Sequence, residues 1–155
     1  MYTPDKIDLK ILAVLQENAN LKIKELAAEV GLSVTPVFDR LKRLEKEGFI
    51  KKYTVILDAD KLNIGFVVFC TVKMKMVNEE INKEFVNAID AIPEITECYN
   101  ISGEYDYLLK VHASSMETYR NIYLHTLGKL NNVASIQSIF VMDESKHEYG
   151  LPVKY

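Results

Sequence analysis

The basic side chains of this 155-residue chain gather in the segment 33–52, where six lysines and arginines accompany three acidic residues. The whole chain carries a net charge of −3, and residues 53–155 hold a net −5. A local basic cluster favours a polyanionic partner more than the sum over the chain suggests. Lys42, Arg43 and Lys46 are spaced to lie on the outer face of one helix, where they suit phosphate oxygens.

Side chains near the beginning of the same predicted helix are suited to contact base edges. Asp39 has two possible roles, because it can accept a hydrogen bond from a cytosine amino group or pair with Arg43 four residues on. The candidate nucleic-acid contacts are Ser33, Thr35, Pro36, Phe38, Asp39, Arg40, Lys42, Arg43 and Lys46. Runs of charge are most often simply a solvated helix face, and that alternative stays open for the basic residues taken alone.

Three short helices are predicted to position these side chains. The first opens at Thr3-Pro4, with Thr3 as a possible cap, and its apolar residues then follow a 3.6-residue period. The second covers about 22–30 and ends at Gly31, and the third covers about 34–47 with Ser33 as a candidate N-cap. A β-rich run at 49–57 follows. Two helices joined by a short glycine-containing turn and followed by a β segment predict a winged helix-turn-helix.

The second half of the chain has a different rhythm. Strands are predicted at 66–76, 95–102, 106–113 and 133–142, and helices at 79–91 and 116–130. The order β-α-β-β-α-β is that of the ferredoxin-like fold. We therefore expect an α+β protein with a winged helix-turn-helix at 1–52, a linker at 53–65, a ferredoxin-like domain at 66–143 and a tail at 144–155. The tail is expected to be extended and to pack on a partner or on the sheet.

Composition excludes several classes of protein. Hydrophobic residues are 48% and charged residues 26%, which is ordinary for a globular protein. No apolar run reaches the length of a membrane span, and the first residues lack the pattern of a secretory signal. Cys70 and Cys98 are expected to be reduced thiols in strands, and the three histidines lack metal-site spacing. The expectation is a cytoplasmic protein with no metal, no cofactor and no membrane partner.

Two groups of motifs resemble the Lrp/AsnC (feast/famine) family of regulators over residues 5–146. In the first half these are Ile7–Leu12, Glu25–Ala27, Val30–Ser33, Pro36, Arg40 and Leu44–Ile50, and Leu32–Pro36 is close to the leucine-responsive branch. In the second half they are Glu97–Tyr99 and Ser102–Lys110, which are similar to the ligand-sensing signature of the family. The resemblance implies a transcriptional regulator that binds double-stranded DNA and is not an enzyme.

The resemblance also implies homodimers that assemble into an octamer and hold a small amino acid between dimers, near the loop from Tyr99 to Asp106. Asp106 is a candidate acceptor for the ammonium of the amino acid, and amides around Gly103 are candidate donors to its carboxylate. No lysine or arginine lies between these two ends of the loop. The candidate effector residues are Tyr99, Ser102, Gly103, Glu104, Tyr105, Asp106, Met116, Ala134 and Ser135, the last two from a neighbouring subunit.

Three alternatives remain. Tyr99 and Met116 are also ordinary packing residues, and Asp106 and Gly103 can simply make a turn. Enzymes similar to this family decarboxylate sirohaem, but they need histidine and basic groups for the tetrapyrrole carboxylates, whereas the loop here is acidic. A third reading is an amino-acid sensor without DNA binding, against which the intact segment Ser33–Lys46 argues.

Overall fold

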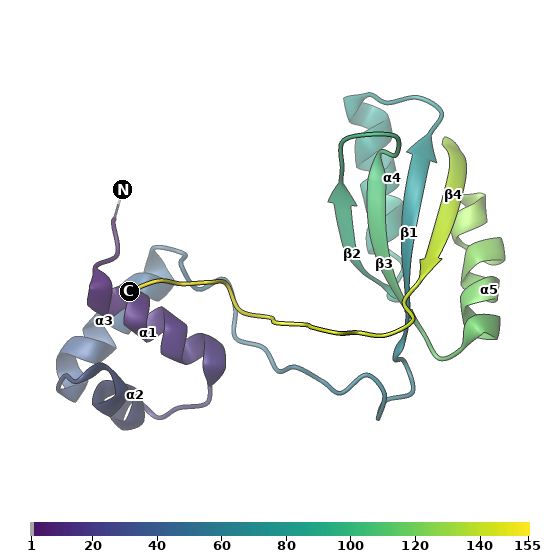
Figure 1. The fold of residues 1–155 in the computed structure, drawn as a ribbon. Coiled ribbons are helices and arrows are strands. Elements are labelled where there is room, and N and C mark those ends of the chain that lie inside the picture. The colour runs from purple at the N-terminus through teal and green to yellow at the C-terminus, as the bar shows by residue number, and fades with distance from the viewer. Residues whose placement is uncertain (1) are drawn as a thin grey trace. The chain divides into compact units, whose positions relative to one another are not determined.

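The computed structural model describes residues 2–155 and divides them into two units. The first unit runs to Ile56 and also includes Lys146–Tyr155, and the second unit is Leu57–Ser145 (Figure 1). The structure therefore extends the first unit beyond the expected boundary at 52 and adds most of the tail to it. The chain leaves the first unit, forms the whole second unit and then returns.

Three helices build the first unit: α1 (Lys6–Glu17), α2 (Ile23–Val30) and α3 (Val34–Lys46). Each helix contributes apolar side chains at helical spacing to one core. Its buried residues are Ile11, Leu26, Ala27, Val30, Val37 and Leu44. Gly31 ends α2 with φ of +75°, a left-handed conformation that suits glycine and turns the chain sharply into α3.

The beginning of α1 differs from the expectation. The N-cap is Asp5 rather than Thr3, and the Asp5 carboxylate accepts hydrogen bonds of 2.9 Å from the amides of Ile7 and Asp8. The Asp8 carboxylate accepts a return bond of 3.0 Å from the Asp5 amide, which completes a reciprocal capping box.

The segment after α3 also differs from the expectation. Residues 50–57 form no strand in the described chain, although their composition favours one. Val55, Ile56 and Leu57 are exposed, the first at 76%. A strand needs a neighbouring strand to satisfy its amides, and none of the four strands of this chain pairs with the segment.

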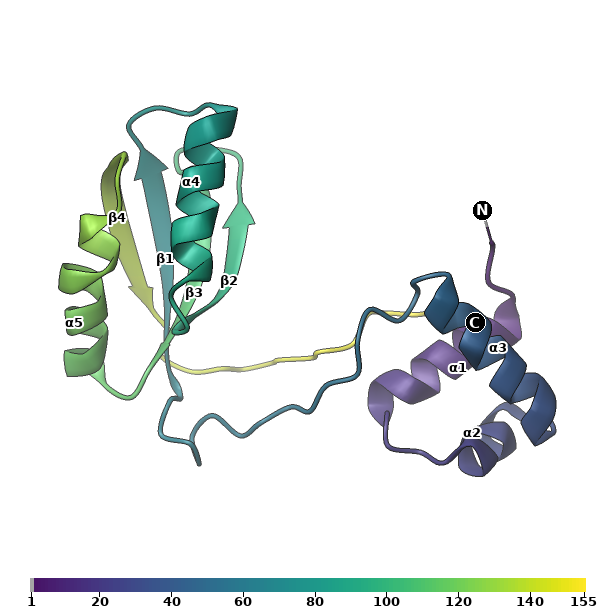
Figure 2. The same cartoon turned by 180° about the vertical axis from the view of Figure 1, so that it is seen from behind.

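The second unit is a four-stranded antiparallel sheet with two helices on one face (Figures 1 and 2). The strands are β1 (Phe66–Met74), β2 (Ile95–Asn100), β3 (Tyr107–Ala113) and β4 (Val133–Phe140), in the order β2-β3-β1-β4. The helices are α4 (Glu79–Asp90) and α5 (Met116–His125), and a 3₁₀ turn, η1 (Leu127–Lys129), follows α5. The element order and the sheet order are those of a ferredoxin-like fold.

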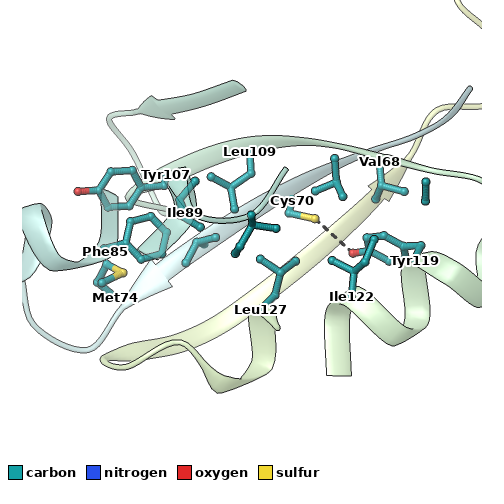
Figure 3. Close-up of a cluster of buried hydrophobic side chains, with 14 residues drawn as sticks. Val68, Cys70, Met74, Phe85, Ile89, Tyr107, Leu109, Tyr119, Ile122 and Leu127 are labelled. Atoms are coloured by element: carbon teal, nitrogen blue, oxygen red, sulfur yellow. Dashed lines mark hydrogen bonds between the residues drawn. The ribbon is translucent and has the colours of Figure 1, made fainter. Parts of the chain in front are cut away.

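The core of this unit lies between the sheet and its two helices (Figure 3). Alternate residues of the central strands, such as Val68, Cys70 and Leu109, are fully buried against Phe85 and Ile89 of α4 and Ile122 of α5. Burial raises the pKa of the Cys70 thiol, whose sulphur lies 3.2 Å from the Tyr119 hydroxyl. A thiol in this environment behaves as a small apolar side chain, as the sequence predicted.

The tail makes a specific contact with α1. The side-chain amide of Gln16 donates to the Leu151 carbonyl at 3.1 Å, and its oxygen accepts from the Leu151 amide at 2.6 Å. One side chain thus satisfies both backbone groups of a tail residue. The expectation that the tail packs on the sheet or on a partner is wrong at Leu151, which contacts α1 instead. The two residues lie 135 positions apart, and the sequence carries no signal for a bond over that separation.

Candidate functional site

The exposed face of α3 carries the polar side chains that the sequence selected. Ser33 precedes the helix in an extended conformation, but its hydroxyl makes no capping bond. The side chains of Ser33, Thr35 and Asp39 are exposed and make no hydrogen bond or ion pair with any residue in the described range 2–155. The alternative Asp39–Arg43 pair is therefore not formed. These three side chains have hydrogen-bonding capacity free for a ligand at the N-terminal end of α3.

The four basic residues of α3 are in different environments. Lys46 is exposed and makes no ion pair among the described residues, whereas the Lys42 ammonium lies 2.7 Å from the Glu45 carboxylate. That ammonium also lies 5.7 Å from the centroid of the Phe38 ring, which is 47% exposed. An exposed ion pair of this kind contributes little to stability, so Lys42 can exchange Glu45 for a phosphate.

Arg40 and Arg43 turn toward the beginning of α1. Arg40 Nη1 lies 2.6 Å from the Asp5 carboxylate and 2.7 Å from the Asp8 carboxylate. The Arg43 guanidinium lies 4.5 Å from the centroid of the Tyr2 ring and 3.7 Å from Asp8, and its side chain is 45% exposed. Arg43 remains accessible to a phosphate, whereas Arg40 joins α3 to α1. The candidate interface thus rests on Lys42, Arg43 and Lys46, while Arg40 primarily fixes the helix.

Asp8 is the buried centre of this contact, with no exposed side-chain surface. Burial by itself raises the pKa of a carboxyl, but hydrogen bonds from the Tyr2 hydroxyl, the Asp5 amide and Arg40 outweigh it. The pKa of Asp8 therefore lies below its usual range. Hydrogen bonds from the Asp8 amide and from Arg40 likewise lower the pKa of Asp5. Both carboxylates are charged near neutral pH and hold the arginine.

In the second unit, the loop between β2 and β3 contains five of the nine candidate effector residues, Ser102 to Asp106. Gly103 has φ of +117°, in the region that L side chains rarely adopt, although a Cβ at this position would meet no atom within 4 Å. The glycine is needed for the backbone conformation rather than for space. Ser102 and Glu104 beside it are exposed. The loop therefore presents its backbone and polar side chains to solvent.

Asp106 anchors this loop to β1. Its carboxylate accepts a 2.8 Å hydrogen bond from the Met74 amide and lies 3.4 Å from the Lys73 ammonium. The backbone oxygen of Asp106 accepts from the backbone amide of Ile101 and from the side-chain amide of Asn100, at 3.0 Å each. Asp106 is thus already well occupied, so its capacity to accept a ligand ammonium is limited.

Lys73 is the residue that sequence reasoning missed. The sequence placed no cation within the loop, but antiparallel pairing of β1 with β3 brings Lys73 beside Asp106. Its side chain is 43% exposed, which leaves the ammonium accessible to a carboxylate. The sequence indicated only that Lys73 lies near the end of a predicted strand. The strand order of the sheet was needed to show that the β2–β3 loop is its neighbour.

The remaining candidate residues lie in different places. Tyr105 donates a 2.8 Å hydrogen bond to Gln137 of β4, and the exposed Tyr99 donates a 2.7 Å bond to Glu97. Ser135 pairs with Lys73 in the β1–β4 register, at the same end of the sheet as the loop. Ala134 precedes it and is exposed. Met116 begins α5 just after β3 ends, so the length of β3 separates it from the loop within one chain.

Two family models match the chain. A winged helix-turn-helix DNA-binding model matches residues 4–51, and the Lrp/AsnC ligand binding domain matches residues 67–151. The chain belongs to the Lrp/AsnC family of transcriptional regulators. It combines a DNA-binding unit with a ligand-binding unit, as the motifs predicted, and α3 is the second helix of the helix-turn-helix.

Named relatives agree with this assignment. The chain is 36% identical to the leucine-responsive regulatory protein of Escherichia coli K12 over 150 residues, covering 97% of this chain and 92% of that protein. It is 33% identical to the transcriptional activator DecR of the same organism, covering 97% and 99%. Both relatives are named as regulators, and together with the two family models they support a transcriptional regulator rather than an enzyme.

Solved structures support the same fold. A transcriptional regulator from Neisseria meningitidis, solved as a complex with L-Met, has a TM-score of 0.93 and 37% identity, covering 97% of both chains. An AsnC family regulator from Agrobacterium tumefaciens has a TM-score of 0.92 and 34% identity, covering 96% of this chain and 97% of that one. E. coli AsnC, at 20% identity and a TM-score of 0.86, shares the fold.

The described residues 2–155 carry neither a membrane-spanning helix nor a cluster of potential metal ligands. No described helix is both long enough and apolar enough to cross a membrane. No group of three or more potential metal ligands lies together in the same range.

Proposed function

We propose that this regulator binds its operator through α3 and that an amino acid held at the loop from Tyr99 to Asp106 changes its affinity for DNA. The exposed face of α3 supports the first part, because Ser33, Thr35 and Lys46 have no partner within the described chain. Ser33 and Thr35 at the beginning of α3 suit base edges, and Lys46 at its end suits a phosphate.

The effector part of the proposal rests on the loop and on Lys73. An amino acid needs donors for its carboxylate and acceptors for its ammonium. The amides around Gly103 and the ammonium of Lys73 are donors at one end of the sheet, and the exposed Glu104 and loop carbonyls are acceptors. The relative from N. meningitidis was solved with L-Met, which supports an amino acid as the ligand class.

Assembly is a second part of the proposal. The sheet face opposite α4 and α5 carries no helix of the described chain and is seen from the front in Figure 1. On this face Lys110 is 8% exposed beside Glu97, and buried Thr71 has an unpartnered hydroxyl oxygen within the described chain. We propose that two copies pair through this face and that dimers assemble into octamers. Ala134, Ser135 and Met116 then reach the effector from neighbouring subunits, since Met116 is remote from the loop of its own chain.

The test is a selection of genomic fragments with purified protein at physiological salt, with and without a pool of the twenty amino acids. The proposal predicts an enriched degenerate palindrome whose recovery the pool changes. We place this activity in the cytoplasm, together with the DNA. Absence of any enriched fragment under both conditions would contradict DNA binding, whereas an enriched fragment unaffected by the pool would contradict the effector.

A further inference from the structure

A cavity of about 210 Å³ lies in the second unit, between α4 and the segment 129–132 that leads into β4. It is lined by one face of α4, at the spacing i, i+3, i+4 and i+7, and by four consecutive residues of the segment. Sites for drug-sized molecules usually measure roughly 300–1,000 Å³. The volume of this cavity therefore matches a molecule about as small as a free amino acid.

The floor of the cavity is apolar and belongs to the core of the unit. Phe85 is 3% exposed and stacks at a centroid distance of 4.4 Å on Tyr107 of β3. Ile81 and Leu130 are half-buried and pack on the same core, one from each wall. Ala88, one turn after Glu84, contributes only a methyl group and leaves the space above it open. Such a floor suits an aliphatic or thioether side chain.

Two opposite charges flank this floor from different walls. Glu84 belongs to α4 and Lys129 to the end of η1, and both line the cavity. Both side chains are exposed, and neither side chain makes an ion pair or hydrogen bond with any residue in the described part of the chain. By contrast, Lys83 on the adjoining face of α4 lies 2.7 Å from Glu79. The cavity thus offers one free carboxylate and one free ammonium.

The wall formed by the segment is fixed rather than loose. Asn132 has φ of +62°, and its backbone oxygen accepts a 2.8 Å hydrogen bond from the Lys75 amide. Its side-chain amide donates a 2.8 Å bond to the Met76 carbonyl. These bonds tie the segment to the chain that follows β1, so the space between Lys129 and α4 exists before any ligand arrives.

We propose that this cavity is a second amino-acid site, distinct from the loop at Tyr99–Asp106. Glu84 pairs with the ammonium of the ligand, Lys129 pairs with its carboxylate, and its apolar side chain rests on Phe85. A ligand with a single charge would leave one of the two protein charges without a partner, whereas a zwitterion satisfies both. The site does not depend on the effector loop, because the two share no residue.

The experiment measures protection from hydrogen exchange in the full chain with millimolar L-methionine. We expect protection of the peptides covering 81–88 and 129–133 in the wild type. The same protection in Gly103→Ala would show that this site is separate from the loop.

Ala88→Phe fills the cavity and should abolish the protection. Glu84→Gln and Lys129→Gln are surface changes that keep the fold. Each should raise the methionine concentration that gives half-maximal protection by about tenfold. Lys83→Gln is the matched control and should behave as the wild type.

The ligand is varied in the same assay. N-acetyl-L-methionine lacks the ammonium and L-methioninamide lacks the carboxylate, so neither should protect these peptides at the concentration that suffices for L-methionine. The proposal is overturned if free methionine gives no protection there, or if Ala88→Phe is protected as fully as the wild type. Equal protection by N-acetyl-L-methionine also overturns it, because that result indicates a peptide-like occupant instead.

Discussion

Arg40 of α3 and Asp8 of α1 form an ion pair of 2.7 Å in which the aspartate has no exposed side-chain surface. Asp5, the N-cap of α1, shares the same guanidinium at 2.6 Å. The orientation of α3 is thus set by a bond to the beginning of α1. The residues that cap α1 therefore also position α3, the helix through which we propose that the protein binds DNA.

Removing Arg40 is expected to destabilise the DNA-binding unit. Arg40→Ala removes the nearer cation from a buried carboxylate and leaves only Arg43 at 3.7 Å, so it should lower the free energy of unfolding by about 3 kcal/mol. Urea unfolding monitored by circular dichroism measures this change. Lys42→Ala is the matched control, because its exposed pair with Glu45 should be worth less than about 1 kcal/mol. Equal losses in the two variants would contradict the structural role of Arg40.

The same pair makes the DNA-binding unit sensitive to acid. The folded pKa of Asp8 and that of Asp5 lie below their usual values, so their contribution to stability is present above the unfolded pKa near ~3.9. That contribution is lost as the pH falls from the unfolded pKa to below the pKa of these carboxyls in the folded protein. Unfolding followed between neutral pH and acid should show this loss. Asp8→Asn should have a shallower dependence, and a dependence identical to the wild type would contradict the assignment.

Lys46 is expected to contact a phosphate. Lys46→Gln should weaken DNA binding and reduce the slope of log affinity against log salt by about 0.9, since one phosphate contact is lost. Fluorescence anisotropy with an enriched operator fragment over a salt series measures the slope. Lys24→Gln, on an exposed position of α2, is the control and should change the slope less. An unchanged slope in Lys46→Gln would remove this residue from the interface.

The Gly103 backbone is expected to be essential for the effector response. Gly103→Ala strains a loop that needs φ of +117° and should weaken amino-acid binding by about tenfold or more. Ser102→Ala keeps the backbone and should bind within a few-fold of the wild type if the amides supply the donors. Isothermal titration with the effector compares the two variants. Strong binding by Gly103→Ala would exclude the loop backbone from the site.

Gln16 is expected to hold the tail on α1. Gln16→Ala removes both bonds to Leu151, so the Leu151 amide should exchange with solvent several-fold faster. Glu17→Ala, at the next exposed position, is the control. Exchange of this amide at the wild-type rate in Gln16→Ala would show that other contacts hold the tail.

Periodicity and local capping chemistry were enough to predict most of the fold. The apolar residues of α1, α2 and α3 and the alternation in β1 indicated the correct elements, because their burial follows from sequence spacing. The N-cap of α1 was wrong because Thr3 and Asp5 are both good caps, and only the reciprocal bond to Asp8 decides between them. The strand predicted at 49–57 requires a partner strand, and propensity alone does not supply one.

The candidate sites were predicted less completely, because long-range pairing decides them. Lys73 lies 33 residues before Asp106 in sequence, and only the β1–β3 register brings them together. Arg40 looked like another basic residue on α3, but the buried Asp8 draws it inward across 32 positions. Residue type and helix face indicated the chemistry, and tertiary contacts determined which charges remained free.

The central claim is that an amino acid bound to the second unit changes the DNA affinity of the first. The most direct measurement is the affinity of the wild type and of Gly103→Ala for an enriched operator fragment, with and without the amino-acid pool at constant salt. We predict that the pool shifts the wild-type affinity by about fivefold or more and leaves that of Gly103→Ala nearly unchanged. Identical wild-type affinities with and without the pool would contradict the account.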